Sequence, residues 1–210
     1  MKRILIFMAM AATAFITACS GGKEQDSSAA ALEVIMSRTS IRSFTGDPVS
    51  KEQLEVILKA GMAAPTAMNS QPWRFVVITD KARIEELFCN GPRSGMFKTA
   101  GAVIVVCGQT TAMRKPFGQP DAPEVEMENI FWFEDCSAAT QNILLAVNAL
   151  GLGAVWTAGY PAMERVASVA EALGLPEKVV PLCVIPIGVP AETPAPKDKW
   201  NPSNIHWEQW

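Results

Sequence analysis

The sequence predicts one domain in which helices and strands occur together, the content of the α+β class. Four short apolar runs have the length and composition of buried strands. Longer stretches between them repeat apolar residues every three or four positions, as helices with a buried face do. The chain has 210 residues, of which 49% are hydrophobic, enough for the core of a single domain. This periodicity leaves the order of the strands open.

The N-terminal segment, residues 1–18, has the pattern of an export signal. Two basic residues precede the apolar run 4–14, which is too short to span a bilayer as a mature helix. Ile16-Thr17-Ala18-Cys19 resembles the lipobox of bacterial lipoproteins. We therefore expect a lipoprotein signal peptide, with Cys19 as the lipidated N-terminus that anchors the protein to a membrane on the exported, periplasmic side. An ordinary secretory signal is the alternative, and the protein is cytoplasmic if the signal interpretation is wrong.

The remaining chain divides into a tether and a domain. Residues 19–31 are rich in glycine, serine, alanine and charge, which predicts a flexible tether. Residues 32–210 are expected to form the folded domain. The formal net charge of −3, without a dense basic run, argues against a nucleic-acid partner.

Cysteine and histidine usage excludes several kinds of site. The four cysteines after Cys19 match no metal-binding spacing, so no metal site is expected. Cys107 and Cys183 lie in apolar runs and are interpreted as small buried hydrophobes. The single histidine, His206, stands beside Trp207 in the tail and is interpreted as structural, which leaves no histidine for a triad elsewhere.

The first elements of the domain surround a polar segment. Residues 32–37 predict a short helix that leads into residues 38–44. Ser50 and, three residues later, Gln53 form a capping box, which predicts a helix that ends near Gly61. Residues 65–73 contain two prolines and are not expected to form a regular element.

The middle of the chain alternates strands with helices. Residues 73–79 contain the continuous apolar run 75–78, which predicts a strand covered on both faces. Asp80 is expected to cap a helix that runs to Phe88, and residues 102–107 predict a second buried strand. Residues 109–129 contain three prolines and are interpreted as a loop that forms either a lid or the substrate-facing rim.

The C-terminal half begins with a long helix over residues 130–150, apolar nearly all round and therefore expected to be buried on most sides. Residues 154–157 predict a third strand, residues 161–173 a helix, and residues 179–189 a fourth strand. The tail from residue 190 has no core pattern of its own and is expected to pack over another surface.

Arg38, Ser40 and Arg42 alternate along a short segment. If the segment is extended, all three side chains point the same way. Two guanidinium groups with a hydroxyl between them suit a phosphate that carries a polyol chain. A solvated basic turn before a helix is the alternative.

A second polar segment lies between the two prolines of residues 65–72. Asn69 and Gln71 carry carboxamides, which donate and accept hydrogen bonds at once and so suit the edge of a planar ring. The alternative is that both carboxamides satisfy the local backbone of a turn.

Six motifs in order resemble the nitroreductase family of FMN-dependent oxidoreductases, from about Leu32 to the end of the chain. They are R-[ST]-S-x-R-x-F at 38–44, P-x-x-x-N-x-Q-P-W at 65–73, DCSAA at 135–139, GLGAVW at 151–156, KDKW at 197–200 and IHW at 205–207. The resemblance implies an α+β fold with a mixed, mostly antiparallel sheet flanked by helices. It also implies an intertwined homodimer with two FMN sites at the interface.

The resemblance assigns residues to FMN by motif position. Arg38, Thr39 and Ser40 would hold the phosphate and ribityl chain, and Arg42 would reach the pyrimidine edge, where a positive charge stabilises the reduced flavin. Pro65, Thr66, Ala67 and Asn69 would approach the flavin ring from the second subunit, with Gln71 as a weaker candidate and Ala67 limited to its backbone. The backbone of Thr157, Ala158 and Gly159 would lie near flavin N5, and Lys197 and Lys199 would return to the phosphate; a solvated basic tail is the alternative for this pair.

The implied activity is ping-pong hydride transfer through flavin N5, from NADH, NADPH or another donor to a nitroaromatic, quinone or related small-molecule acceptor. No catalytic side chain is required. A flavin-fragmenting or dehalogenating branch of the same fold and a non-enzymatic lipid-anchored binding protein are the alternatives. NAD(P)H is a cytoplasmic reductant, so an exported location would require another electron source.

Overall fold

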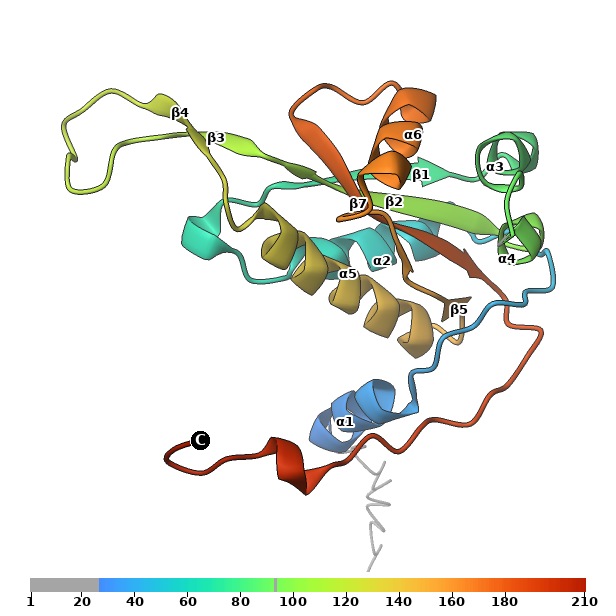
Figure 1. The fold of residues 1–210 in the computed structure, drawn as a ribbon. Coiled ribbons are helices and arrows are strands. Elements are labelled where there is room, and N and C mark those ends of the chain that lie inside the picture. The colour runs from blue at the N-terminus through green and yellow to red at the C-terminus, as the bar shows by residue number, and fades with distance from the viewer. Residues whose placement is uncertain (1–26, 93) are drawn as a thin grey trace, which may run out of the picture.

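The computed structural model describes residues 27–92 and 94–210 (Figure 1). The predicted signal peptide 1–18, the lipidation site Cys19 and most of the predicted tether lie outside the described residues. Helix α1, Ser27–Ser37, begins inside the segment predicted to be the end of the tether, so the helical part of the chain starts earlier than expected. No described helix combines the length and the apolar character that crossing a membrane requires.

One antiparallel sheet forms the centre of the domain (Figure 1). Its strands run in the order β1 (Trp73–Ile78), β2 (Ala102–Gln109), β7 (Val179–Gly188) and β5 (Gly153–Ala154), and β6 (Thr157–Ala158) also pairs with β7. All of these pairings are antiparallel. The α+β class is therefore confirmed.

Strand β2 separates two hydrophobic cores because its side chains alternate between the two faces of the sheet. Ile104 and Val106 belong to the core on one face, whereas Val103 and Val105 belong to the core on the other. A strand whose two faces are both buried reads as a continuous apolar run, which is the pattern that predicted it.

Helices cover both faces of the sheet. Helices α2 (Lys51–Met62) and α5 (Trp132–Ala149) pack together on one face, while α6 (Met163–Leu173) lies on the opposite face (Figure 1). Helices α3 (Lys81–Phe88) and α4 (Ser94–Lys98) contribute to the same core as α6. The domain thus has three layers with the sheet in the middle.

The expected capping box of α2 is present. The side chain of Ser50 accepts from the backbone N–H of Gln53 at 3.2 Å, and the Gln53 side chain accepts from the N–H of Ser50 at 3.0 Å. Gly61 lets α2 approach α5 closely, since a Cβ at this position would lie 2.9 Å from Cγ1 of Ile143. The contact between α2 and α5 holds the segment after α2 against the start of α5.

The predicted loop 109–129 is confined to residues 115–124, because paired strands flank that stretch. Strands β3 (Thr111–Arg114) and β4 (Val125–Glu128) pair as a hairpin that extends away from the sheet (Figure 1). All four residues of β4 are exposed. Without a buried face, the hairpin shows no alternation of apolar and polar residues, and the three prolines of this region concealed it.

Three further expectations need correction. The β1 strand is an edge strand, and Val77 is exposed rather than covered. The predicted strand 154–157 is two separate short strands, β5 and β6, which pair with different parts of β7. The long helix buries one face only: Asp135, Ile143 and Val147 are buried, whereas Phe133 and Leu150 are exposed.

Two single-turn 3-10 helices complete the described elements. The first, Ala67–Asn69, follows α2, and the second, Pro202–Asn204, lies in the tail. The tail runs from the end of β7 back towards α1 (Figure 1). Its course brings residues near the C-terminus to the segment that follows α1.

Candidate functional site

The Arg38–Phe44 segment is extended and held between β5 and the start of the tail. The N–H of Ile41 donates to the carbonyl of Ala154 at 3.0 Å, and the N–H of Thr45 donates to the carbonyl of Val189 at 3.0 Å. Ile41 and Phe44 are buried. Arg42 is exposed and Ser40 is half-buried beside the buried Ile41, but the alternation is not strict, because Phe44 is buried two residues after Arg42.

The tail closes a cavity of about 920 Å³ over this segment. Arg38, Ser40 and Arg42 line it from one side, and Lys197 and Lys199 line it from the tail. The structure thus brings together two groups of basic residues that lie more than 150 positions apart in the sequence. The other lining residues are Ile35, Met36, Thr39, Pro194, Ala195, Pro196, Asp198 and Trp200.

The cavity carries a strong excess of positive charge. Four cationic side chains line it against one carboxylate, that of Asp198, which accepts from the backbone N–H of Trp200 at 2.9 Å. No ion pair among the described residues involves Arg38, Arg42, Lys197 or Lys199. Unpaired cations beside a hydroxyl fit an anionic group such as a phosphate, so the residues present suit FMN.

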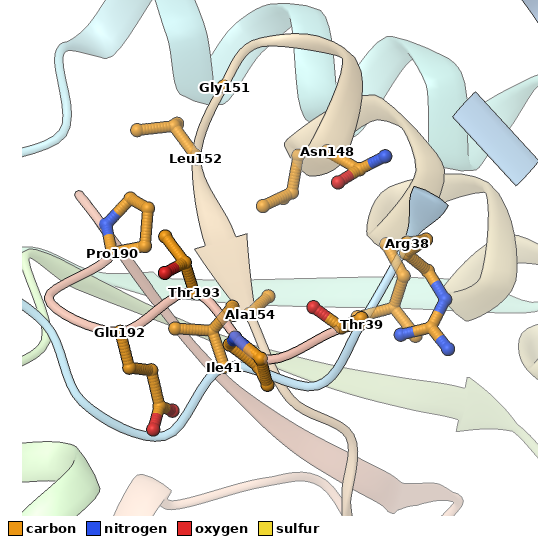
Figure 2. A pocket seen from close by; sticks show the side chains of 13 residues that line it. Arg38, Thr39, Ile41, Asn148, Gly151, Leu152, Ala154, Pro190, Glu192 and Thr193 are labelled. Atoms are coloured by element: carbon orange, nitrogen blue, oxygen red, sulfur yellow. The ribbon is translucent and has the colours of Figure 1, made fainter. Parts of the chain in front are cut away.

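A smaller cavity of about 230 Å³ adjoins the segment on its other side. Figure 2 shows Arg38 and Asn148 at one side of it and Pro190 and Glu192 at the other. Thr39 lines both cavities, so its side chain is placed beside the cationic row as predicted. Residues of the tail and of α5 therefore enclose the segment together.

Two residues that the sequence did not indicate hold this segment. The side-chain amide of Asn148 donates to the carbonyl of Val34 at 3.0 Å and to Oγ of Ser37 at 2.9 Å, which fixes the end of α1 just before Arg38. The carboxylate of Glu192 accepts from the backbone N–H groups of Arg42 and Ser43. Contacts over such sequence separations leave no local pattern.

The segment between the prolines is ordered by a buried carboxylate. Asp135, 5% exposed, accepts from the N–H of Ala67 at 2.9 Å and from the hydroxyl of Ser70 at 2.8 Å. Asn69 and Gln71 have positive φ angles of 53° and 45°, and the Gln71 side chain donates to Oδ1 of Asn69 at 2.9 Å. Both carboxamides remain exposed.

The two clusters lie at opposite ends of α5 in one chain. Asp135 stands at the beginning of the helix and Asn148 near its end, and a rise of 1.5 Å per residue separates them by about 20 Å. Neither cavity at the Arg38–Phe44 segment is lined by Pro65, Thr66, Ala67, Asn69 or Gln71. In one chain, the two clusters therefore do not meet at either of these cavities.

The third predicted segment, Thr157 to Gly159, lies on the sheet. The hydroxyl of Thr157 donates to the carbonyl of Val184 at 2.6 Å, and the N–H of Gly159 donates to the carbonyl of Leu182 at 2.9 Å. These residues line neither of the two cavities. Ala158 is the exposed residue of the three and is the one open to a ligand.

The described cysteines are free thiols; Cys107, Cys136 and Cys183 are buried, whereas Cys89 is half-buried. Burial raises the pKa of Cys107, Cys136 and Cys183 to about 12. Each is therefore protonated at neutral pH, and a protonated thiol is a poor nucleophile. The expectation that Cys107 and Cys183 are buried hydrophobes is confirmed.

Comparison with known proteins places this geometry in a family. The sequence profile described as the nitroreductase family matches residues 35–93 and 85–189. A protein of Methanothermobacter thermautotrophicus, provisionally named NADH dehydrogenase/NAD(P)H nitroreductase, is 39% identical over 179 residues, which cover 85% of this chain and 87% of that protein.

Two crystal structures show the same fold. A provisionally named NADH dehydrogenase/NAD(P)H nitroreductase from Bacteroides thetaiotaomicron has a TM-score of 0.75 and 40% identity, covering 86% of this chain and 98% of the other. A provisionally named nitroreductase from Desulfovibrio desulfuricans, solved in complex with FMN, has a TM-score of 0.69 and 30% identity, covering 86% and 97%. Because sequence and fold agree over nearly the whole described domain, the protein belongs to the nitroreductase family.

Proposed function

We propose that the protein is an FMN-dependent oxidoreductase that takes a hydride from NADH, NADPH or, at an exported location, another donor and passes it to a nitroaromatic, quinone or related acceptor. The observation that carries the proposal is the cavity in which Arg38, Ser40 and Arg42 face Lys197 and Lys199. Relatives named as NAD(P)H nitroreductases and a related structure that contains FMN support it. FMN supplies the reversible acceptance of hydride at N5 when it is bound.

Residues at different positions in the cavity would bind different parts of FMN. Arg38, Lys197 and Lys199 hold the phosphate, and the hydroxyl of Ser40 adds a donor beside them. Each hydrogen bond to a charged group contributes about 1.5–3 kcal/mol, so two or three such bonds retain a cofactor tightly. Arg42 supplies a fixed positive charge at the other end of the row, where negative charge develops on reduction.

We also propose that the active form is a homodimer. The 65–71 segment is rigidly held by Asp135, yet it lies at the far end of α5 from the cationic cavity of its own chain. A second copy would bring its Asn69 to the open side of that cavity. We infer the homodimer because the partner chain would then complete the site.

The sequence of the N-terminal segment supports a proposal for the location of the enzyme. We propose that Cys19 is lipidated and that the protein is anchored to a membrane on the exported side. The test is detergent-phase partition of the full chain: the natural protein enters the detergent phase, and Cys19→Ala stays in the aqueous phase. Equal partition of both forms would contradict lipidation.

The activity is tested by anaerobic reduction. We expect the FMN-loaded protein to lose its visible absorbance on addition of NADH or NADPH and to regain it when a quinone or nitroaromatic is added. Parallel lines in double-reciprocal plots would show that donor and acceptor use the same site in turn. Protein that carries FMN but is bleached by neither nucleotide would contradict the donor and favour a specialised branch of the fold.

A further inference from the structure

The carboxylate of Glu192 lies where the tail leaves β7 and meets the Arg38–Phe44 segment. Its Oε1 accepts from the backbone N–H of Arg42 and from that of Ser43, the latter at 3.1 Å. The surrounding backbone is paired as well, because the N–H of Ala191 donates to the carbonyl of Ser43 at 2.9 Å. Glu192 therefore joins two consecutive amides of the segment that forms one wall of the cationic cavity.

The carboxylate of Glu192 bonds to backbone amides and not to the side chains of the nearby arginines. Glu192 and Arg38 line the same smaller cavity, but no ion pair between Glu192 and an arginine occurs among the described residues. The carboxylate is bound to backbone donors instead, in the charge-assisted hydrogen bonds that are stronger than neutral ones. The guanidinium groups of Arg38 and Arg42 therefore remain free to pair with an anionic ligand, while hydrogen bonds to Glu192 fix the backbone at Arg42 and Ser43.

Glu192 could influence the binding of an anion in two opposite ways. A negative charge beside the cavity repels a phosphate and weakens its binding. A fixed backbone removes the entropy that ordering the segment would otherwise cost on binding, and so strengthens it. The hydrogen bonds to Arg42 and Ser43 decide between the two, because they place the carboxylate at the backbone rather than in the cavity with the cationic row.

We propose that Glu192 is a positioning residue that orders the Arg38–Arg42 segment for the phosphate-bearing cofactor. The inference rests on the proposed function, since FMN is the ligand that it names. The tail then has two roles at the cavity. It contributes Lys197 and Lys199, and through Glu192 it sets the conformation of the Arg38–Arg42 segment on the opposite wall.

The test compares Glu192→Ala with Glu192→Gln, because glutamine keeps the accepting oxygen and loses the charge. Hydrogen exchange of the flavin-free protein reports on the amides of Arg42 and Ser43, and titration of flavin fluorescence gives the dissociation constant for FMN. Glu177→Gln is the matched control, since Glu177 is exposed and its side chain makes none of the hydrogen bonds among the described residues.

We expect Glu192→Ala to speed exchange at both amides and to weaken FMN binding about tenfold, equivalent to about 1.4 kcal/mol. Glu192→Gln should keep amide protection and bind FMN as tightly as the natural protein or more tightly. Glu177→Gln should change neither quantity. The opposite response of the two Glu192 variants separates ordering from charge.

Tighter binding by both Glu192 variants would show that the residue acts only as a repulsive charge and would overturn the proposal. Unchanged exchange and unchanged affinity in Glu192→Ala would also overturn it, with the proposed function intact. If the natural protein bound no FMN although its Arg42 and Ser43 amides were protected, the proposed function would fail and take this role with it.

Discussion

Arg38 and Arg42 carry different parts of the proposed site, although they share one face of one segment. Both line the larger cavity, but only Arg38 also lines the smaller one, where it lies beside Asn148. The side chain of Arg42 is exposed, and its Nη1 comes within 3.5 Å of the carbonyl of Ser40. We therefore expect Arg38 to act on cofactor retention and Arg42 to act on the reduction potential.

Removal of either guanidinium tests this division. Arg38→Ala loses at least one charge-assisted bond to the phosphate, worth about 1.5–3 kcal/mol, so FMN binding should weaken by about tenfold to a hundredfold. Arg42→Ala should keep more of the FMN and lower its reduction potential, by about 30 mV for each 1.4 kcal/mol of lost stabilisation. Fluorescence titration and spectroelectrochemistry measure the two effects.

Lys51→Ala is the control for these arginines, because Lys51 is an exposed cation on α2 whose one ion pair within residues 27–92 and 94–210 is with Glu55 at 3.9 Å. It should alter neither affinity nor potential. If both arginine variants retained flavin with an unchanged potential, the assignment of the cationic cavity to FMN would be wrong.

Sequence alone could predict part of this site at the level of single residues. Arg38, Ser40 and Arg42 were recognisable because a strand alternates its side chains with a period of two. Glu192 and Asn148 were not recognisable, since each acts on a partner more than a hundred positions away. A glutamate in a proline-rich tail and an asparagine near a helix end have no local pattern that marks them as contacts.

At the level of elements, α5 organises the site from both of its ends. Its first turn presents Asp135 to the 65–71 segment, and its last turn presents Asn148 to the end of α1. The buried carboxylate satisfies one backbone N–H and one hydroxyl that would otherwise lack partners. The positive φ angles at Met68, Asn69 and Gln71 depend on such external support, because residues other than glycine rarely adopt them.

Asp135→Ala should therefore destabilise the protein. Loss of the acceptor leaves the Ala67 N–H and the Ser70 hydroxyl without a partner, at a cost of about 1–3 kcal/mol for each group that stays buried. Asp135→Asn keeps one acceptor and should cost less. Glu134→Ala is the matched control, since Glu134 occupies the same first turn but is exposed.

Urea unfolding measures these changes in the free energy of unfolding. Equal midpoints for Asp135→Ala and Glu134→Ala would contradict the role given to the buried carboxylate. A loss confined to FMN affinity, with stability unchanged, would show that Asp135 orders the segment only in the presence of the cofactor.

Prediction of the elements succeeded where burial produced a periodic pattern. The capping box of α2 and the apolar run of β2 were read correctly because each depends on neighbours within a few residues. The β3–β4 hairpin was missed because its strands bury no continuous face. The division of residues 153–158 into β5 and β6 was missed because it depends on pairing with two parts of β7.

The whole molecule should lose stability in alkaline solution. The pKa of Cys107, Cys136 and Cys183 is raised to about 12 by burial, whereas an unfolded thiol has a pKa of about 8.5. Between these values the folded state binds more protons than the unfolded state, so stability falls as pH rises. The contribution is complete below about pH 8.5 and is lost as pH approaches 12.

Urea midpoints at pH 7.5 and pH 10.5 measure this loss. Each thiol contributes a slope of up to about 1.4 kcal/mol per pH unit within this range. Cys107→Ala should show a shallower slope than the natural protein because one titrating thiol has been removed. A stability that stays constant between the two pH values would contradict the burial of these thiols.

The proposed dimer predicts that two defective chains can restore one site. Arg38→Ala removes a cation of the cavity, and Asn69→Gly removes a carboxamide while keeping a residue that tolerates the positive φ. In a mixed dimer, the intact cavity of the second chain would meet the intact 65–71 segment of the first. Mixing the two variants under exchange conditions, at an FMN concentration too low to saturate either homodimer, should therefore give more activity than the sum of the two homodimers.

The control is a sample of Arg38→Ala alone taken through the same exchange procedure, which should recover no activity. Failure of the mixed population, despite mixed dimers seen by native mass spectrometry, would place both clusters in one chain. Within one chain, Asp135 and Asn148 lie about 20 Å apart along α5, and residues 65–71 line neither cavity.

The strand order and the partner chain are properties of the whole molecule that periodicity could not predict. Four strands were predicted from apolar runs. Their order in the sheet, β1-β2-β7-β5, depends on pairings between distant segments. The resemblance to a family implied a mixed, mostly antiparallel sheet, and the described pairings of the central sheet are all antiparallel. The approach of Lys197 and Lys199 to Arg38 likewise depends on the course of the tail over the finished fold.

The most direct test of the central claim is an absorbance spectrum of the purified full-length chain after incubation with FMN and removal of free flavin. We expect the visible bands of bound FMN in a stoichiometric amount, and their loss in Arg38→Ala. A folded natural chain that retains no flavin would contradict the account, because the unpaired cations of the larger cavity would then serve a different ligand.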